Sequence, residues 1–241
     1  MLKRLMNRFN ESNLITDFDK ELNEFKSLNK QDRFSNNEFG YQPCLNDKTS
    51  TTPFDAHYIY HPAWAARVIK KINPVKHIDI SSTLHFCSVL SAFITTEFYD
   101  YRPADITLDN LTSSHADLNN LHFANNSIAS LSCMHTLEHI GLGRYGDPLD
   151  PDGDIKAINE LSRVCAINGN LLLVVPVGGK KIMFNAHRIY NPKEFLSYLP
   201  NFELLDFSLI TDQSKFISNA SLDLAAEQIY GCGCYWLKKI S

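Results

Sequence analysis

The sequence predicts an α/β fold with a doubly wound, mostly parallel sheet of seven strands, an antiparallel edge strand and an N-terminal helical extension. Three observations predict it. From Val75 onward, short apolar runs alternate with segments of helical periodicity, which is typical of a parallel sheet covered by helices on both faces. The run Asn170–Val177 (NLLLVVPV) is almost wholly apolar, as expected of a strand that is buried on both faces. Two strand-length runs close the chain, and the segment between them, Thr211–Tyr230, allows them to pair antiparallel at one edge.

The first 56 residues are expected to form a helical extension and a loop, followed by one α/β domain at residues 57–241. Within residues 1–34, apolar side chains recur every three to four positions and predict a helix: Leu14, Phe18, Leu22 and Phe25. Ser35–Pro53 is polar and rich in Asn, Ser and Thr, so it is expected to be a loop. The sequence leaves open whether the helix is a lid, a dimer contact or a packing element.

The α/β domain shows a periodic run for each further element. Strands are expected at residues 75–80, 96–100, 111–116, 127–134, 170–177, 202–210 and 231–240. Helices are expected at residues 60–72, 83–94, 154–165 and 192–199, the last of which opens with a proline. Residues 101–110 leave little room for the helix that strict alternation would place there.

The composition is that of a globular protein without a strongly charged partner. The 241 residues fit one large domain with an appendage, and 44% hydrophobic residues suffice for a full core. A net charge of −4 argues against general binding of nucleic acid or a membrane surface, and the apolar runs are too short for membrane insertion. No signal-peptide apolar region follows the basic start, so a cytoplasmic protein is expected. A homo-oligomer is compatible with the sequence.

The six cysteines are expected to be reduced core residues, since they are spread along a chain expected in the cytoplasm. Cys232 and Cys234 form the one close pair, and on a strand they would share a face. A zinc site usually takes a second pair of ligands, and none follows the usual spacing here. No metal site is therefore predicted.

The block Ser132–Asp154 (SCMHTLEHIGLGRYGDPLDPDGD) is the strongest candidate for a functional site. It follows an apolar strand and carries a glycine loop. Ligands in open α/β sheets bind at the carboxyl ends of the strands. Four polar residues are expected near that end of the strand: His135, Glu138, His139 and Asp147.

These segments resemble the class I S-adenosylmethionine-dependent methyltransferases, and more closely a little-characterised branch of that superfamily. The branch is marked by the block LEHIGLGRYGDPLDPDGD, which follows HYIYHPAWAAR (His57–Arg67) and precedes VVPVG (Val174–Gly178). The resemblance covers roughly residues 57–199, most of the chain. It implies the Rossmann-like methyltransferase fold and S-adenosyl-L-methionine as cofactor.

The resemblance also implies how the cofactor would lie along the strand ends. The turn after the first strand, Asp79-Ile80-Ser81-Ser82, would approach the methionine part of the cofactor. Asp100 would bind the ribose hydroxyls, Asp117 would border the adenine, and Met134 would lie beside the sulfonium.

One position departs from the superfamily pattern. Members usually carry glycines where this chain has Ser81 and Ser82, because glycine permits positive φ and a close approach of the backbone to a ligand. Serine fits if its φ is negative, and it adds hydroxyl donors. An aromatic group ahead of the first strand either covers the cofactor or packs on the sheet: Tyr58, Tyr60, His61 and Trp64.

Methyl transfer from a sulfonium is an in-line displacement that needs an aligned acceptor and, for a hydroxyl, a general base. Histidine is the usual base, and His135, His139 and His187 compete for the role. His135 is favoured because it directly follows the fourth strand, with Glu138 and His139 in support. The alternatives are that His135 bonds only to backbone and that Glu138 pairs with Arg144.

Acceptor binding is expected from Arg144 and Tyr145 on the glycine loop and from His187 and Arg188 after the fifth strand. Arginine suits a phosphate or carboxylate, although Arg188 could instead pair with the acidic loop. That loop carries four aspartates, and Asp152 or Asp154 is expected to cap the following helix in preference to binding a metal ion.

The sequence therefore predicts S-adenosylmethionine-dependent O-methylation of a small-molecule acceptor. The association of the resembling branch with bacterial surface-polysaccharide enzymes implies a sugar, a sugar nucleotide or a glycan-linked phosphate. Two alternatives stay open. The Ser81–Ser82 turn favours a non-catalytic binding or scaffold protein with the same fold, and a similar sheet could also serve a nucleotide-sugar transferase.

Overall fold

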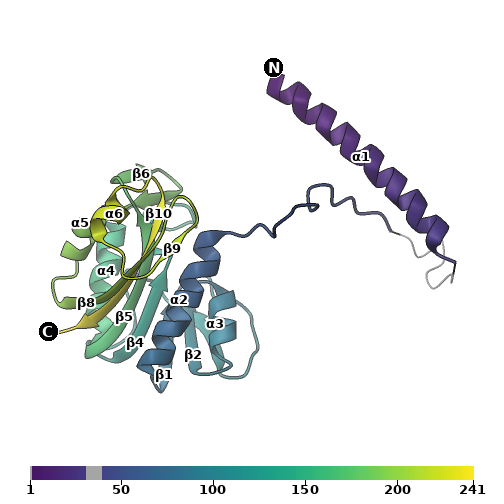
Figure 1. Ribbon diagram of the computed structural model, residues 1–241. Coiled ribbons are helices and arrows are strands. Elements are labelled where there is room, and N and C mark those ends of the chain that lie inside the picture. Colours follow the sequence, from purple (N-terminus) through teal and green to yellow (C-terminus); the bar gives the residue numbers. More distant parts are fainter. Residues whose placement is uncertain (1, 31–39) are drawn as a thin grey trace. The chain divides into compact units, whose positions relative to one another are not determined.

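The structure is a computed structural model that describes residues 2–30 and 40–241 (Figure 1). The chain divides into two units, Met1–Phe54 and Asp55–Ser241. In the first unit, helix α1 spans Leu2–Leu28 and confirms the predicted helix as far as Leu28. The end of that prediction, at residues 31–34, and the start of the predicted loop lie outside the described residues. None of the described helices is both long and apolar enough to span a membrane.

The second unit is built on a mixed sheet of eight strands in the order β3-β2-β1-β4-β5-β10-β8-β9. Strands β1 to β5 are mutually parallel, whereas β10 runs antiparallel to both of its neighbours. The strands of this sheet are β1 (Lys76–Ile80), β2 (Thr95–Asp100), β3 (Leu111–His115), β4 (Ile128–Met134), β5 (Cys165–Val177), β8 (Phe202–Ile210), β9 (Phe216–Ile217) and β10 (Gly231–Lys239). The predicted α/β class with a mostly parallel sheet is confirmed.

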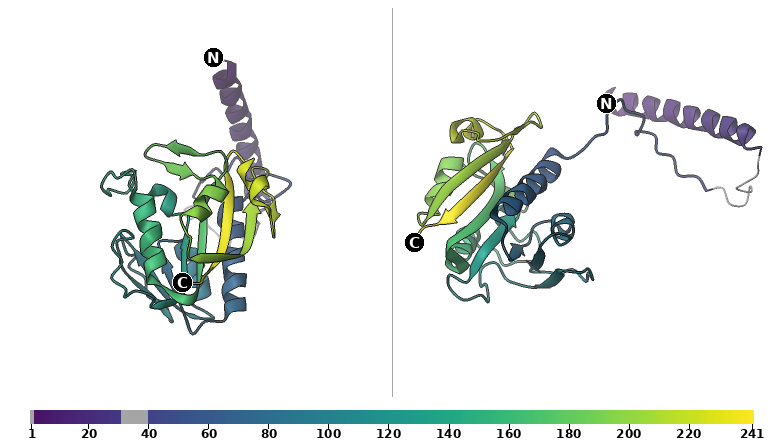
Figure 2. Two further views of the ribbon diagram at one scale, coloured as in Figure 1. Left: turned by 90° about the vertical axis from the view of Figure 1, so that its left-hand side faces the viewer. Right: turned by 60° about the horizontal axis from the view of Figure 1, so that its bottom comes forward.

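Helices cover both faces of this sheet, as Figures 1 and 2 show. One core contains Trp64 and Ile69 of α2 together with Phe86 of α3, and the other contains Ile158 of α4 and Phe195 of α5. The helices of this unit are α2 (Ala56–Ile72), α3 (Leu84–Leu90), α4 (Gly153–Val164), α5 (Pro192–Ser197), α6 (Leu222–Ala226) and the short 3-10 helix η2 (Leu137–His139). The fold is therefore a three-layer sandwich.

The last strands differ in detail from the prediction. β8 and β10 pair antiparallel as expected, but β10 lies between β5 and β8, and the two-residue β9 forms the antiparallel edge. The reason is visible in β10 itself, since seven of its nine residues, including Cys232 and Cys234, are buried. A strand without a polar face is stable inside a sheet and not at its edge.

Two other elements differ from their predictions. Helix α2 begins at Ala56, four residues before the predicted Tyr60, because the Asp55 carboxylate caps it by accepting a hydrogen bond from Tyr58 N. A hairpin of β6 (Lys181–Met183) and β7 (His187–Ile189) was not predicted, since each strand has three residues, too few to show a strand periodicity, and β6 is exposed throughout. The hairpin carries His187 toward the site described next.

Candidate functional site

A cavity of about 440 Å³ opens at the carboxyl ends of β1 to β4. Ser81 follows β1, Asp100 ends β2, Asp117 follows β3, and His135 and Thr136 follow β4. This is the edge at which open α/β sheets bind ligands. The glycine loop supplies the opposite wall through Tyr145, Asp147, Pro148 and Asp150. Three of the residues expected to bind the cofactor, Ser81, Asp100 and Asp117, thus line one cavity.

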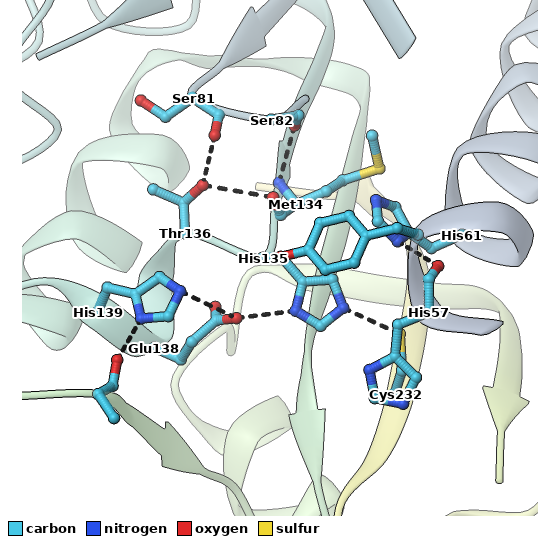
Figure 3. Close-up of polar contacts among 12 residues, drawn as sticks. His57, His61, Ser81, Ser82, Met134, His135, Thr136, Glu138, His139 and Cys232 are labelled. Atoms are coloured by element: carbon cyan, nitrogen blue, oxygen red, sulfur yellow. Dashed lines mark hydrogen bonds and ion pairs between the residues drawn. The ribbon is translucent and has the colours of Figure 1, made fainter. Parts of the chain in front are cut away.

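The turn after β1 keeps the backbone shape that usually requires glycine. Ser81 has a φ of +58°, so the negative φ expected for a fitting serine is not found. Its N–H donates to Tyr99 O (2.7 Å). Its carbonyl accepts from the Thr136 hydroxyl (2.7 Å), as Figure 3 shows. These two bonds hold the left-handed conformation of the turn, and Ser81 still faces the cavity.

Replacing Ser81 by glycine is expected to leave the turn intact. A non-glycine residue in the left-handed region costs about 1 kcal/mol, so glycine relieves that strain in the folded state. The larger conformational entropy of glycine in the unfolded chain offsets part of this stabilisation. We expect Ser81→Gly to stay within about 1 kcal/mol of the wild-type free energy of unfolding. Ser82→Gly is the matched control, because it removes the hydroxyl that accepts from Met134 N (3.0 Å) and so loses about 1 kcal/mol. Urea unfolding is the measurement, and a lower free energy of unfolding for Ser81→Gly than for Ser82→Gly would contradict this expectation.

The structure places Asp79, Ser82 and Met134 differently from their expected contact with the cofactor. Asp79 is fully buried and accepts hydrogen bonds from Ser82 N (3.0 Å) and from the Ser132 hydroxyl. The bond to Ser82 N stabilises the turn after β1. Its burial raises its pKa to about 6. The Met134 side chain is buried in the core on the α2 side of the sheet. None of these three side chains lines the cavity. Asp79 and Met134 lie on strands, where alternate residues point to opposite faces.

A second cavity, of about 510 Å³, adjoins the first. The two share His135, His139 and Tyr145, so a group bound in one would meet a group bound in the other at these residues. The remaining lining of the second cavity is polar and aromatic: Tyr58, Glu138, Arg144, Asn185, Ala186, His187 and Tyr230. Arg144, Tyr145 and His187, all expected to bind the acceptor, therefore lie together.

The three predicted catalytic residues form one connected group (Figure 3). The turn η2 brings Glu138 onto His135, whose Nδ1 lies 2.8 Å from Glu138 Oε1. His139 Nε2 lies 3.8 Å from the same oxygen, and His139 Nδ1 donates to Ala186 O (2.5 Å). Within the described chain, Glu138 Oε2 is buried and has no hydrogen-bond partner. A buried carboxylate oxygen without a partner is costly, which indicates that a ligand supplies one.

Burial controls the charge of this group. It raises the pKa of Glu138 to about 7 and lowers the pKa of His135 to about 4, because a low-dielectric surrounding disfavours either charged form. His135 is therefore neutral near pH 7, and Glu138 is partly ionised. The expectation that His135 is the base is not supported by its contacts, since Nδ1 faces Glu138 and Nε2 faces Cys232 Sγ (3.3 Å).

Aromatic rings surround His135. His57 stacks on it with ring centroids 5.5 Å apart, and the ring of Tyr230 stacks on His57 at 5.3 Å. His61 meets His135 edge-on at 5.0 Å. The ligand-type atoms of His57, His135 and Cys232 all lie within 4.8 Å of one another. These residues come from α2, the end of β4 and β10.

The glycine loop, residues 141–150, is held in place by hydrogen bonds between its own residues. Gly141 has a φ of +78° and donates from its N–H to Asp147 Oδ2 (2.7 Å), while Asp147 Oδ1 accepts from Tyr145 N. The Tyr145 ring lies under the guanidinium groups of Arg102 (4.7 Å) and Arg144 (5.1 Å). Asp147 is thus a loop-shaping residue, and its carboxylate holds Tyr145 in place between the cavities.

Arg188 lies outside both cavities, in contrast to its expected role in acceptor binding. It is buried, forms an ion pair with Asp154 (3.5 Å) and donates to the carbonyls of Ile140 (2.6 Å) and Pro151 (3.1 Å). The alternative of pairing with the acidic loop is therefore correct. Asp152 makes no side-chain cap bond at the start of α4, whereas the Asp154 carboxylate, in the first turn, accepts from the Tyr190 hydroxyl (2.9 Å).

Several lining residues carried no usable signal in the sequence. Tyr230 reaches the second cavity from just before β10, and Asn185 from the β6–β7 turn. His57 lines neither cavity but stacks on His135. Thr136 lies beside His135 and joins the ends of β4 and β1 through its bond to Ser81 O. These positions depend on strand order, which a local pattern does not contain.

The strand order, the antiparallel β10 and the cavity at the ends of β1 to β4 define the class of fold. It is the fold of the class I S-adenosylmethionine-dependent methyltransferases. A methyltransferase of this kind from Clostridium acetobutylicum is 13% identical, with a TM-score of 0.51 over 76% of this chain and 93% of that one. The 1,6-didemethyltoxoflavin-N1-methyltransferase of Burkholderia thailandensis, with bound 1,6-didemethyltoxoflavin and S-adenosylhomocysteine, is 9% identical, with a TM-score of 0.53 over 76% and 79%.

The chain belongs to the family DUF268, described as a Caenorhabditis protein of unknown function, whose model matches residues 86–232. The match spans most of the α/β unit, from α3 into β10. No curated protein matches the chain in sequence.

Proposed function

We propose that this protein transfers a methyl group from S-adenosylmethionine to a hydroxyl group of a small polar molecule. The observation that carries the proposal is the buried Oε2 of Glu138, which has no hydrogen-bond partner in the described chain and belongs to a residue that lines the second cavity. An acceptor O–H would satisfy this oxygen by donating to it. The carboxylate would then take the proton as the acceptor oxygen attacks.

The first cavity fits the cofactor. Asp100 Oδ1 accepts from Arg102 N (2.7 Å), and its second carboxylate oxygen has no hydrogen-bond partner in the part of the chain that the structure describes. That oxygen suits the hydroxyls of a ribose, and the φ of Ser81 preserves the close backbone approach that the methionine part needs. When bound, S-adenosylmethionine supplies an electrophilic methyl group.

The residues of this chain supply position and proton transfer. Tyr145, His139 and His135 lie at the junction of the cavities, where the acceptor oxygen must be held in line with the methyl group. His135 donates from Nδ1 to Glu138 Oε1 and orients the carboxylate, which leaves Oε2 for the acceptor. The proton removed from the acceptor ends on Glu138, beside His139.

The second cavity favours an acceptor with a ring and a negative charge. Tyr58 and Tyr230 offer flat apolar surfaces, while Arg144 and His187 offer donors for a phosphate or carboxylate. A sugar nucleotide or a sugar phosphate carries both features and also the hydroxyl to be methylated. This acceptor class agrees with the one that the resemblance implies.

Titration calorimetry with S-adenosylhomocysteine tests the cofactor part of the proposal. Asp100→Asn keeps the oxygen that accepts from Arg102 N but replaces the one available to the ribose with an N–H donor. Losing a charge-assisted bond of about 1.5 to 3 kcal/mol is expected to weaken binding by about 10- to 100-fold. Asp105→Asn, an exposed change in the same loop that lies outside the cavity, is the matched control and should bind as wild type does. Equal affinities in all three proteins would place the ribose elsewhere.

A further inference from the structure

We propose that His57, His135 and Cys232 form a binding site for a zinc-class divalent metal ion beside the second cavity, which His135 lines. Their ligand atoms lie within 4.8 Å of one another, although the three residues come from distant parts of the chain. Two imidazoles and a thiolate are a ligand set that zinc and its chemical analogues prefer. The site was not expected from the sequence, since Cys232 has no ligand nearby in the chain at a zinc spacing.

The geometry around His135 is that of a metal ligand with an outer carboxylate. His135 Nδ1 donates to Glu138 Oε1 at 2.8 Å, which fixes the tautomer and leaves the lone pair of Nε2 on the opposite side of the ring. That lone pair faces Cys232 Sγ at 3.3 Å. Zn–N and Zn–S bonds in a tetrahedral site place the two ligand atoms about 3.5 Å apart. The His135–Cys232 edge is therefore already close to the spacing that a bound ion requires.

His57 completes the set from the first turn of α2. Its ring stacks on that of His135 with an interplanar angle of 16°, and it also stacks on the ring of Tyr230, with centroids 5.3 Å apart. The separations of up to 4.8 Å in the set exceed a tetrahedral edge, so an adjustment of roughly 1 Å by the partly exposed His57 would close the site.

The unsatisfied polar atoms of the region support a missing partner. Five buried side-chain atoms lack a hydrogen-bond partner in the described chain, and two of them, His61 Nε2 and Glu138 Oε2, belong to side chains in contact with His135. Since Glu138 Oε2 is assigned to the acceptor, His61 Nε2 is the atom that bears on the metal site: its lone pair lies in the same buried region as the His135–Cys232 pair, which a cation would stabilise.

Binding converts the Cys232 thiol to a thiolate and releases one proton to solvent, while both histidines bind through neutral nitrogens. Three protein ligands leave a fourth position for water or for a group from the acceptor cavity, which His135 lines. The ion would also fix the first turn of α2 to β10.

The test is titration of the metal-free full-length protein with Co²⁺, which reports a thiolate ligand through a sulfur-to-cobalt charge-transfer band. We expect one equivalent to bind with this band, and Zn²⁺ to displace it. Cys232→Ser is expected to abolish the band and to weaken Co²⁺ binding at least ~10-fold. Cys234→Ser, a change to a buried cysteine two residues away on the same strand, should keep both, as should Cys44→Ser, which removes an exposed thiol.

His57→Gln is a second variant for the case that Cys232→Ser does not fold. It keeps the Cys232 thiol and removes one imidazole ligand, so the charge-transfer band should be retained but weakened. A folded wild type without the band, or a band that survives in Cys232→Ser, would overturn the metal site. Calorimetry with S-adenosylhomocysteine on the same samples separates this outcome from a failure of the proposed methyl transfer.

Discussion

Glu138→Gln is expected to reduce methyl transfer by about 10²- to 10⁴-fold while leaving the affinity for S-adenosylhomocysteine unchanged. Glutamine has the same shape and keeps an oxygen for the His135 Nδ1–H, but it cannot take the acceptor's proton. The buried amide would also present an N–H group where the acceptor needs a free oxygen. The rate effect follows from the chemistry of one atom, so the fold should be unaffected.

The measurement is release of S-adenosylhomocysteine in a screen of sugar nucleotides and sugar phosphates, followed by kcat for each accepted compound. Glu227→Gln, an exposed change outside both cavities, is the control and should match wild type. A Glu138→Gln enzyme with wild-type kcat would exclude Glu138 as the base and favour His139, which lines both cavities.

Gly141→Ala is expected to destabilise the protein by about 3 kcal/mol or more, which lowers the melting temperature by roughly 6 to 12 °C. A Cβ at this position would lie 2.0 Å from the carbonyl oxygen of Asp150, and the φ of +78° is itself unfavourable for alanine. Because Gly141 anchors the loop that carries Tyr145 and Asp147, binding of S-adenosylhomocysteine should weaken as well.

Gly146→Ala separates the two causes of that effect. Its φ is +85°, but no atom lies within 4 Å of the added Cβ, so only the conformational cost of about 1 kcal/mol remains. Thermal unfolding of the two variants should therefore differ clearly. Equal losses of stability would show that the contact between Gly141 and Asp150 does not hold the loop as the structure describes.

Much of the fold could be predicted because its signals are local. The continuous apolar run of β5, the stripe of α4 and the proline at the start of α5 each report burial or capping within a few residues. The insertion of β10 between β5 and β8 could not be predicted in the same way, since it depends on which strands this largely buried strand pairs with.

The residues of the candidate site also differ in whether a local sequence signal predicts their position. Asp100 and His135 follow strand ends, and a strand end that can be identified in the sequence places its polar residue at the ligand edge. Asp79 and Met134 also lie near strand ends, yet their side chains point into the core, because a shift of one position on a strand reverses the face. Arg188 satisfied carbonyls that only the folded loop brings together.

The contribution of β10 lay beyond any local pattern. Cys232 lies 97 positions from His135 in the chain, and Tyr230 precedes the same strand. Both reach the site only because β10 enters the sheet next to β5. The positive φ of Ser81 was also unexpected, since it depends on hydrogen bonds to Tyr99 and Thr136 and not on the residue itself.

A crystal structure of the protein with S-adenosylhomocysteine would show whether the cofactor lies beside Glu138. We predict the ribose on Asp100, the adenine beside Asp117, and the sulfur at the junction of the two cavities near His139 and Tyr145. S-adenosylhomocysteine bound elsewhere, or a folded protein whose cavity at the ends of β1 to β4 stays empty at saturating ligand, would contradict a methyl-transfer site at the Glu138 carboxylate.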